Sequence, residues 1–463
     1  MSSPHQLDSP RDLPPVLPVS KILGPSFIIL GLGLGSGEII LWPYLSSNYG
    51  LGMAWAILIG VTMQFFINME VERYALIYGE SIFVGFARWL KLLPIWFIIS
   101  TFLGFGWPGI GLAGATLVSH LFNFDSVRLT GIIIFLLIGL ILTVGKRVYV
   151  TVETLQKYLI SIGTPFIIIL TFILAKHQDW VTLGRGLVGI GDGFRFLPEG
   201  LAMSTFLGAL AFAGAGGNLN LAQSFYIRDK GYGMGKFSHQ IKNIFTNSAK
   251  NLDINLSGRT FPLTSQNLHT FKKWWHNINL EHFLVFWCLG LTTMLTLSLL
   301  AYVSTQGHPD NPEGIKFVLT QAMFIGEKTL PFFSTLFLLT TGLMLCATQL
   351  TVLDSTSRII TENFLLFRGK KHGQVSLIYY LVLWLQILFG IIIIASDFSQ
   401  PRELITLSAA FNGLAMFVYT ALILYLNNKR IPAPLRPSIV RNVVLLLTFC
   451  FFGYLCFQIL FPL

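Results

Sequence analysis

Charged residues are scarce in this sequence of 463 residues. They make up 11% of it, whereas a soluble globular domain carries about 25%. Hydrophobic residues make up 53%, and the mean hydropathy is +0.68. Because so little polar surface is available, one water-soluble core could not bury the apolar side chains. The composition excludes an ordinary soluble domain and predicts an integral membrane protein.

Cysteine is also rare, and its placement excludes two classes of small structural site. All four cysteines lie inside apolar runs, and none has the spacing of a CxxC or zinc-finger partner. We therefore expect no disulfide framework, no structural metal and no cofactor. The sequence also lacks HExxH and GxSxG, which argues against an enzyme.

The first 20 residues lack the pattern of a cleaved leader. They are polar and Pro-rich, with no basic segment leading into a short apolar core and a cleavage site. We expect residues 1–20 to form a polar cytosolic tail.

What the sequence does contain is a series of eleven apolar runs. Each is near or above the roughly 20 residues that a helix needs to cross the hydrocarbon core of a bilayer. They predict an all-α polytopic membrane protein with spans at about 25–47, 51–76, 93–122, 129–149, 156–176, 200–228, 281–305, 330–366, 375–396, 404–427 and 440–461.

Lysine and arginine divide unevenly between the two ends of these spans. If the N-terminus is cytoplasmic, 24 of the 31 basic residues lie on the cytoplasmic side or at the flanking helix ends. The positive-inside rule favours this orientation. An odd number of spans then places the C-terminus outside, and we expect a multi-pass protein of a bacterial inner or plasma membrane.

Two connections are longer than the others. Residues 229–280 are polar and basic, and we interpret them as a cytosolic loop lying on the inner leaflet, or alternatively as a regulatory or partner-binding loop. Residues 309–328 are amphipathic and too short to span, so we expect an external surface helix there.

Glycines interrupt two of the spans. In the first span, four glycines precede an acid: Gly31, Gly33, Gly35, Gly37 and Glu38. In the sixth span, three glycines precede two amides: Gly214, Gly216, Gly217, Asn218 and Asn220. Glycine costs about 1 kcal/mol relative to alanine inside a helix, and polar residues follow at once, so we expect unwound stretches that line a polar cavity. Close helix packing through small residues is the alternative for either span alone.

The pairing of the interrupted spans favours the cavity. They are five spans apart and start from opposite sides of the membrane, as in an inverted repeat of five plus five helices whose broken helices meet at the midplane. We expect a first repeat over 21–178, a second repeat over 179–428 and an eleventh helix over 429–463.

Three segments carry a family resemblance. Gly24-Pro25 leads without a gap to Gly35-Ser36-Gly37-Glu38, where the Nramp family typically has an Asp-Pro-Gly-Asn break. Ala215-Gly216-Gly217-Asn218-Leu219 stands where that family has Met-Pro-His-Asn-Leu, and Thr348-Gln349 in the eighth span is also similar. The chain thus resembles a divergent member of the Nramp (solute-carrier 11) divalent-metal transporters. That resemblance implies a LeuT-like 5+5 inverted repeat with discontinuous helices 1 and 6, plus an eleventh helix.

The departures from the family concern the metal site. The family's Asp, Asn and Met ligands are here replaced by Gly35, Glu38 and Ala215. A soft sulfur ligand favours transition metals, so its loss argues against selective manganese or iron transport. The third span, from Trp96 to Phe122, has no acid, whereas the family carries acids on its proton path there.

Glu38 is the first candidate functional residue, because a carboxylate at mid-membrane depth is costly. It would ligate a cation or carry the coupling proton; a structural, protonated glutamate is the alternative. The predicted substrate-binding set is Gly35, Ser36, Gly37, Glu38, Ala215, Gly216, Gly217, Asn218, Asn220 and Gln349.

Two substrate classes stay open. A hard divalent cation would use Glu38, backbone carbonyls and side-chain amides, with H⁺ or Na⁺ as the coupling ion. A small anion such as bicarbonate would instead use the N–H groups at the starts of the half-helices. A third hypothesis, of another class, is a sensor or scaffold without transport. We expect a monomer, because both repeats lie within one chain, and no nucleic-acid partner.

Acids near the inner ends of two spans are interpreted as gate elements. Glu70, Glu72 and Arg73 are expected to form an inner-gate ion-pair cluster. Asp354, Arg358 and Glu362 are spaced i, i+4, i+8, which predicts ion pairs within one helix.

Overall fold

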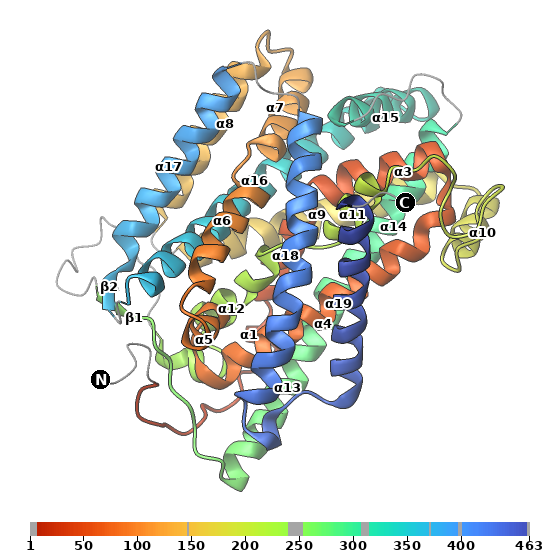
Figure 1. Cartoon of the computed structure of the whole chain (residues 1–463). Coiled ribbons are helices and arrows are strands. Elements are labelled where there is room, and N and C mark those ends of the chain that lie inside the picture. Colours follow the sequence, from red (N-terminus) through yellow and green to blue (C-terminus); the bar gives the residue numbers. More distant parts are fainter. Residues whose placement is uncertain are drawn as a thin grey trace.

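The structure of the protein is a computed structural model that describes residues 7–145, 148–238, 253–306, 314–369, 372–396 and 401–460. Packed helices make up nearly all of it (Figure 1). The strands in the described part are β1 (Asp253–Asn255) and β2 (His372–Gln374), which pair antiparallel.

Every predicted span corresponds to helix. The first five are formed by α2 (Pro25–Gly33) with η1 (Ser36–Leu41) and α3 (Trp42–Tyr49), η2 (Leu51–Met53) with α4 (Ala54–Tyr78), α6 (Leu93–Phe105) with α7 (Gly109–Phe122), α8 (Val127–Val144) and α9 (Val148–Leu174). The next six are formed by α11 (Met203–Ala211) with α12 (Leu219–Lys230), α13 (Ser265–His282) with η5 (Phe283–Leu289) and α14 (Gly290–Thr305), α16 (Pro331–Phe367), α17 (Val375–Ala395), α18 (Pro401–Lys429) and α19 (Ile439–Leu460). The connecting helices are α1 (Val19–Ile22), α5 (Ile82–Trp89), α10 (His177–Gly186), η3 (Gly233–Phe237), α15 (Ile315–Lys328) and η6 (Ala433–Leu435).

Eight of the described helices are long and apolar enough to cross a membrane, and a ninth span is the broken pair Pro25–Gly33 and Gly37–Tyr49. The two remaining predicted spans are α11 with α12, each too short to cross alone, and α18, where several side chains near the start lie outside the described part. The membrane-crossing class is therefore confirmed, while the full number of eleven stays a prediction.

Large apolar side chains point outward along several helices. Examples are Leu140 of α8, Ile162 of α9 and Leu388 of α17, which are all more than half exposed. Polar side chains such as Glu38 and Asn218 are buried instead. This inside-out distribution is what a bilayer solvent requires, because the lipid-facing surface must be apolar and polar groups must find partners inside the bundle.

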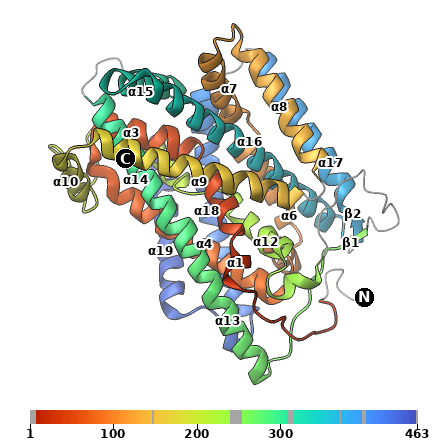
Figure 2. The ribbon, with the colours of Figure 1, turned by 180° about the vertical axis from the view of Figure 1, so that it is seen from behind.

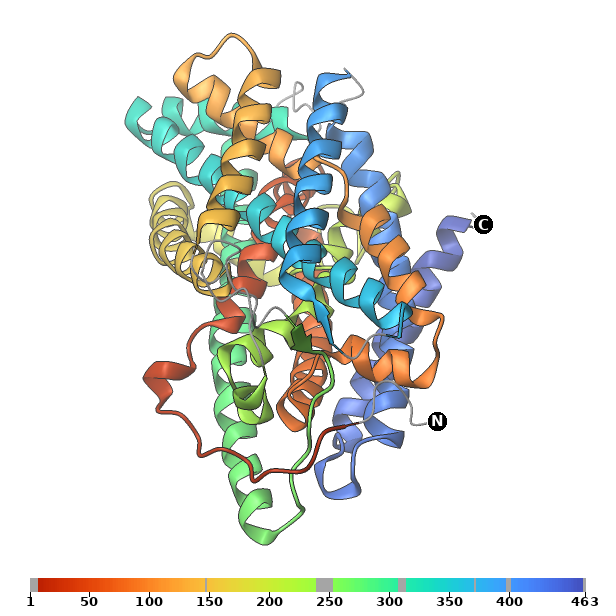
Figure 3. The same cartoon turned by 90° about the vertical axis from the view of Figure 1, so that its left-hand side faces the viewer.

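The helices α10 and α15 lie at one end of the bundle and α13 at the other (Figures 1 and 2). The N-terminal segment crosses the α13 end, as Figure 3 shows. It is bonded to α13 itself: the indole of Trp274 donates to the carbonyl of Pro14 at 2.8 Å, and the backbone N–H of Leu13 donates to Asn267 at 3.1 Å. We call this end of the bundle the tail end.

Two helical segments differ from the predicted bounds. The seventh span begins at Ser265 rather than near 281, because α13 is amphipathic and runs straight into η5 and α14. Its buried face carries Phe271 and Trp274, and its other face is polar, which hydropathy alone does not detect. The third span is interrupted between α6 and α7, next to Pro108.

Candidate functional site

The first span is broken where its glycines cluster. The helix α2 ends at Gly33, and η1 begins a π-helical turn that carries Glu38; the two halves of the span are bent by 44°. A Cβ on Gly35 would lie 2.6 Å from the methyl carbon of Thr348, so glycine allows α16 to approach the break.

The second break separates α11 from α12. Gly214, Gly216 and Gly217 have φ values of 128°, 74° and 43°, which residues with a side chain rarely adopt. The clustering of glycine is thus explained by backbone conformation, and helices 1 and 6 are discontinuous as predicted.

The two breaks lie against each other. A Cβ on Gly33 would be 3.0 Å from the Cα of Gly214, and one on Gly37 would overlap the carbonyl oxygen of Phe212. Residues almost 180 positions apart are therefore in backbone contact at the centre of the bundle. Glycine is needed on the first-span side because any side chain would push the two half-helix pairs apart.

Glu38 lies at this junction and is 1% exposed. Its Oε1 atom would be 3.0 Å from a Cβ on Gly33, and its Oε2 atom has no hydrogen-bond partner within the described part of the chain. A buried carboxylate is costly unless a proton or a cation neutralises it. The junction therefore offers a binding position for one or the other.

Two asparagines follow the second break and present further oxygens. Asn218 donates to the hydroxyls of Ser100 and Thr101 at 2.7 and 2.9 Å, and Asn220 donates to the hydroxyl of Tyr419 at 3.0 Å. The Oδ1 atoms of both asparagines are buried and lack partners among the described residues. Their amide hydrogens face neighbouring helices, which leaves acceptor oxygens for a ligand.

A third asparagine was missed by sequence reasoning. Asn412 of α18 donates to the carbonyl of Gly104 at 3.2 Å, while its Oδ1 has no described partner and lies where a Cβ on Gly217 would be. Its only sequence signal is a polar residue within an apolar run.

Gln64 of α4 was also missed, and it holds the second break. Its Oε1 accepts from the backbone N–H of Gly216 at 3.0 Å, and its Nε2 donates to the carbonyls of Leu210 and Ala211 at 3.4 and 3.3 Å. One side chain thus bonds backbone groups on both sides of the break, including the N–H of Gly216.

The remaining predicted site residues are Gln349, Ala215 and Ser36. Gln349 points to α7, where its Oε1 accepts from the backbone N–H of Gly111 at 2.9 Å, and it is Thr348 that bonds the first span, at the carbonyl of Gly31. Ala215 is buried in the second break. The side chain of Ser36 lies outside the described part of the structure.

Within the described residues, no group of three or more His, Cys, Asp or Glu side chains is placed to hold a metal ion. A cation at the junction would therefore be bound by one carboxylate, that of Glu38, together with neutral amide and backbone oxygens. Such all-oxygen surroundings suit hard cations.

A second buried polar cluster lies at the tail end of the same half-helices. His282 Nδ1 is 2.7 Å from the hydroxyl of Ser26 and 3.2 Å from Glu72 Oε1, and Gln223 donates to that Oε1 at 2.6 Å. The Ser26 hydroxyl also donates to Glu281. The cluster connects α2, α4, α12 and α13 through three titratable side chains, and sequence reasoning found only Glu72 of them.

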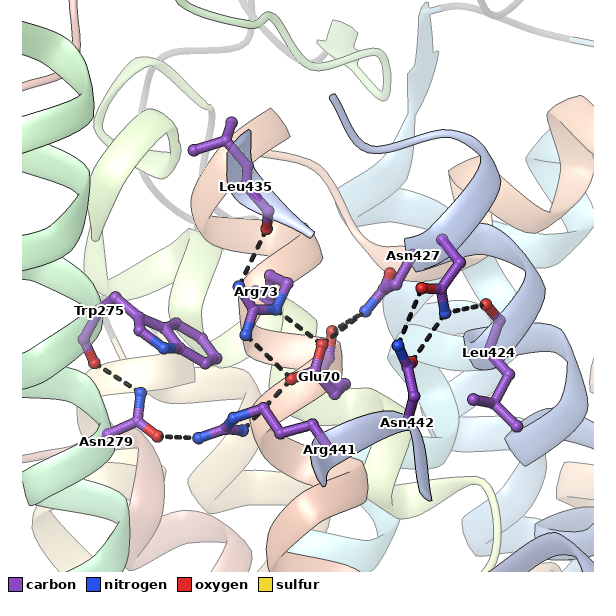
Figure 4. A network of polar contacts seen from close by, with 10 residues as sticks. Glu70, Arg73, Trp275, Asn279, Leu424, Asn427, Leu435, Arg441 and Asn442 are labelled. Carbon is purple, nitrogen blue, oxygen red and sulfur yellow. Dashed lines mark hydrogen bonds and ion pairs between the residues drawn. The ribbon is translucent and has the colours of Figure 1, made fainter. Parts of the chain in front are cut away.

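The three predicted gate residues divide between two clusters. Glu70 and Arg73 form a buried pair with Nε to Oε2 at 2.7 Å, and Arg441 of α19 joins it at 3.2 Å (Figure 4). Glu72 points away from this pair, into the cluster around His282. This follows from the helical repeat, because residues two positions apart face opposite sides of a helix.

The acids of α16 pair partly within the helix and partly outside it. Arg358 bonds Asp354 at 2.9 Å and also Asp229 of α12 at 2.5 Å. Glu362 bonds Arg228 at 2.9 Å rather than Arg358. The i, i+4 pair predicted for Asp354 is present, while the second carboxylate ties α16 to α12.

The chain shares its fold with a manganese transporter. A crystal structure of a substituted form of that transporter, from Eremococcus coleocola, superposes with a TM-score of 0.69 at 13% identity over 99% of this chain and 92% of the other. Mhp1, a nucleobase-cation-symport-1 family transporter with bromovinylhydantoin bound, gives a TM-score of 0.50 at 12% identity, over 99% and 95%. No protein-family model and no curated protein sequence matches the chain. The all-α polytopic fold is thereby confirmed.

Proposed function

We propose that this protein is a secondary transporter that carries a hard cation across the membrane at the junction of its two broken helices. The observation that carries the proposal is the carboxylate of Glu38, buried at the contact between the breaks, with Oε2 lacking a partner in the described part. Broken helices that meet inside the bundle are the arrangement used for ion and substrate sites in transporters with inverted repeats.

A cation is favoured over an anion by the kind of atoms that lack partners. At the residues that form or contact the two breaks, these atoms are Glu38 Oε2 and the Oδ1 atoms of Asn218, Asn220 and Asn412, which are all acceptors. An anion would need donors, and the N–H of Gly216 is already bonded to Gln64. A bicarbonate symporter is therefore the second candidate.

A divalent ion such as Mg²⁺ is the substrate we infer, because the site offers oxygen ligands and has Ala215 where the resembling family has a sulfur ligand. The coupling ion is H⁺ or Na⁺. The cluster of Glu72, Glu281 and His282 would be its second binding position, since these groups lie next to the tail-end half of the first span. The surplus of basic residues supports a cytoplasmic tail end.

The test is uptake by purified protein in liposomes of Mg²⁺, Mn²⁺ and bicarbonate, under imposed H⁺ and Na⁺ gradients. We expect saturable Mg²⁺ uptake that Glu38→Gln abolishes. Glu327→Gln is the matched control, because Glu327 is an exposed acid on α15, far along the chain from both breaks. Size-exclusion and thermal-unfolding profiles show whether each variant is folded.

The outcomes separate the candidates. High-affinity Mn²⁺ uptake would contradict the inference from Ala215, and gradient-driven bicarbonate uptake would favour the anion transporter. If Mg²⁺ uptake by Glu38→Gln equals that of the wild type, the role of Glu38 is excluded. If folded wild-type protein takes up no ion in the panel, the proposal fails and the sensor or scaffold becomes the better hypothesis.

A further inference from the structure

A basic pocket opens at the tail end, between the start of α13 and the turn from α18 to α19. It has a volume of about 370 Å³ and is separate from the breaks. Four cations line it: Arg73, Lys272, Arg436 and Arg441. None of the described residues that line it is acidic.

The two inner arginines are held in fixed positions. Their guanidinium carbons lie 3.9 Å (Arg73) and 4.8 Å (Arg441) from the ring centroid of Trp275, and both groups bond Glu70 Oε1, at 3.1 and 3.2 Å (Figure 4). A single carboxylate thus serves two guanidinium groups. Within the described residues, no second carboxylate is bonded to either guanidinium group.

The rim adds two more positive charges. Lys272 of α13 and Arg436 before α19 are both exposed, and they line the pocket from two segments that are far apart in the sequence. With Glu70 counted, these four cations and one acid have a net formal charge of +3, and a bound anion would reduce the repulsion among the cations. Guanidinium groups are suited to phosphate in particular, because one group can donate two parallel N–H···O hydrogen bonds to two phosphate oxygens.

The position of the pocket also matters. Both helices beside it continue into membrane-spanning segments, and two apolar residues between the lining residues Ser438 and Arg441 are exposed, Ile439 at 82% and Val440 at 66%. The pocket therefore lies where lipid-facing surface begins, at headgroup level, where basic pockets between helices bind anionic headgroups.

We propose that this pocket is a binding site for a phosphate-bearing anion, with Arg73 and Arg441 at its base and Lys272 and Arg436 at its rim. The phosphate can come from the headgroup of an anionic lipid or from free phosphate in solution. The proposal does not depend on the transport function, because neither the broken helices nor Glu38 takes part in the site.

The experiment uses full-length protein and two double variants with the same change of charge. Lys272→Gln with Arg436→Gln removes both rim cations. Lys273→Gln with Lys429→Gln is the control, because these exposed residues are close in sequence to the first pair but do not line the pocket. The first measurement is native mass spectrometry of protein purified with phosphatidylglycerol or with phosphatidylcholine. The second is thermal unfolding in detergent with increasing inorganic phosphate.

We expect the wild type to retain phosphatidylglycerol but not phosphatidylcholine, and the rim variant to lose about tenfold or more of that retention while the control keeps it. If only inorganic phosphate stabilises the protein, and only when the rim is intact, the site is supported and its ligand comes from solution. Equal retention by both variants with no variant-dependent phosphate effect overturns the proposal, as does an equal loss in both.

Discussion

The side-chain oxygen of Gln64 accepts a hydrogen bond from the backbone N–H of Gly216 at 3.0 Å. The amide nitrogen of the same side chain reaches the carbonyls of Leu210 and Ala211, so one glutamine from the second span bridges both sides of the second break. The break is therefore supported from outside its own helix.

This bridge gives the first prediction. Gln64→Leu keeps the size of the side chain but removes its donor and its acceptor. We expect an unfolding free energy lower by about 1–3 kcal/mol, because a buried backbone N–H is left without a partner, and a loss of ion uptake. Gln64→Glu retains the acceptor for the N–H of Gly216. Its unfolding free energy should therefore lie between those of the wild type and Gln64→Leu. Chemical denaturation in detergent measures the unfolding free energy, and flux into liposomes measures ion uptake. If both are unchanged in Gln64→Leu, the bridge is dispensable.

Glycine substitutions test the contact between the breaks. In Gly37→Ala the new methyl group would overlap the carbonyl oxygen of Phe212, whereas in Gly184→Ala, on α10, nothing lies within 4 Å of the added carbon. We expect Gly37→Ala to lower the unfolding free energy by more than about 1 kcal/mol and to stop uptake. Gly184→Ala should be neutral or raise it by up to about 1 kcal/mol, because alanine favours the helix. If the two variants have the same unfolding free energy and the same uptake, the close contact between Gly37 and Phe212 is contradicted.

A substitution of His282 tests the role of the buried cluster that His282 forms with Glu72 and Glu281. Its ring is stacked with Phe65 and Phe286, with centroid distances of 5.5 and 4.8 Å, so His282→Phe should preserve packing while it removes the contacts to Ser26 and Glu72. We expect loss of uptake driven by a proton gradient.

Exchange of substrate across the liposome membrane should survive in His282→Phe, because exchange needs no net proton movement. His276→Phe, at an exposed position of the same helix, is the control. Full proton-driven uptake by His282→Phe would exclude this histidine from coupling.

Arg358 tests the ion pairs that join α16 to α12. Arg358→Met leaves Asp354 without its buried cation and Asp229 with Arg228 alone, and breaking a buried ion pair in this way typically costs about 3–5 kcal/mol. We expect a marked fall in the thermal unfolding temperature. Arg368→Met, at the exposed end of the same helix, should change it little. If the two variants unfold alike, the buried network does not contribute to stability.

The sequence predicted the two breaks well because backbone conformation has a strong local signal. Runs of glycine followed by polar residues identified the first break to within a few positions of Gly35 and the second at Gly216. The side chains that support the breaks, Gln64, Thr348 and Asn412, were less visible. Gln64 and Asn412 are isolated polar residues in long apolar runs, and Thr348 stands beside Gln349, so no local pattern tells which side chain faces the break and which faces another helix.

The tail-end network shows the same limit. Glu70, Glu72 and Arg73 are adjacent in sequence and were grouped together, but the helix sends Glu72 toward His282 and the other two toward Arg441. Which partners meet each face depends on α13 and α19, which lie 200 and 370 residues away along the chain.

The sequence by itself determined the solvent, the class of fold and the places where helices unwind, because hydropathy, charge asymmetry and glycine act over short stretches of chain. Only the tertiary structure decided which unwound segments touch, where Glu38 is buried, and which cations share a single carboxylate. Those features arise from contacts between distant helices, whose direction and rotation about their axes are set by the packing of the whole bundle.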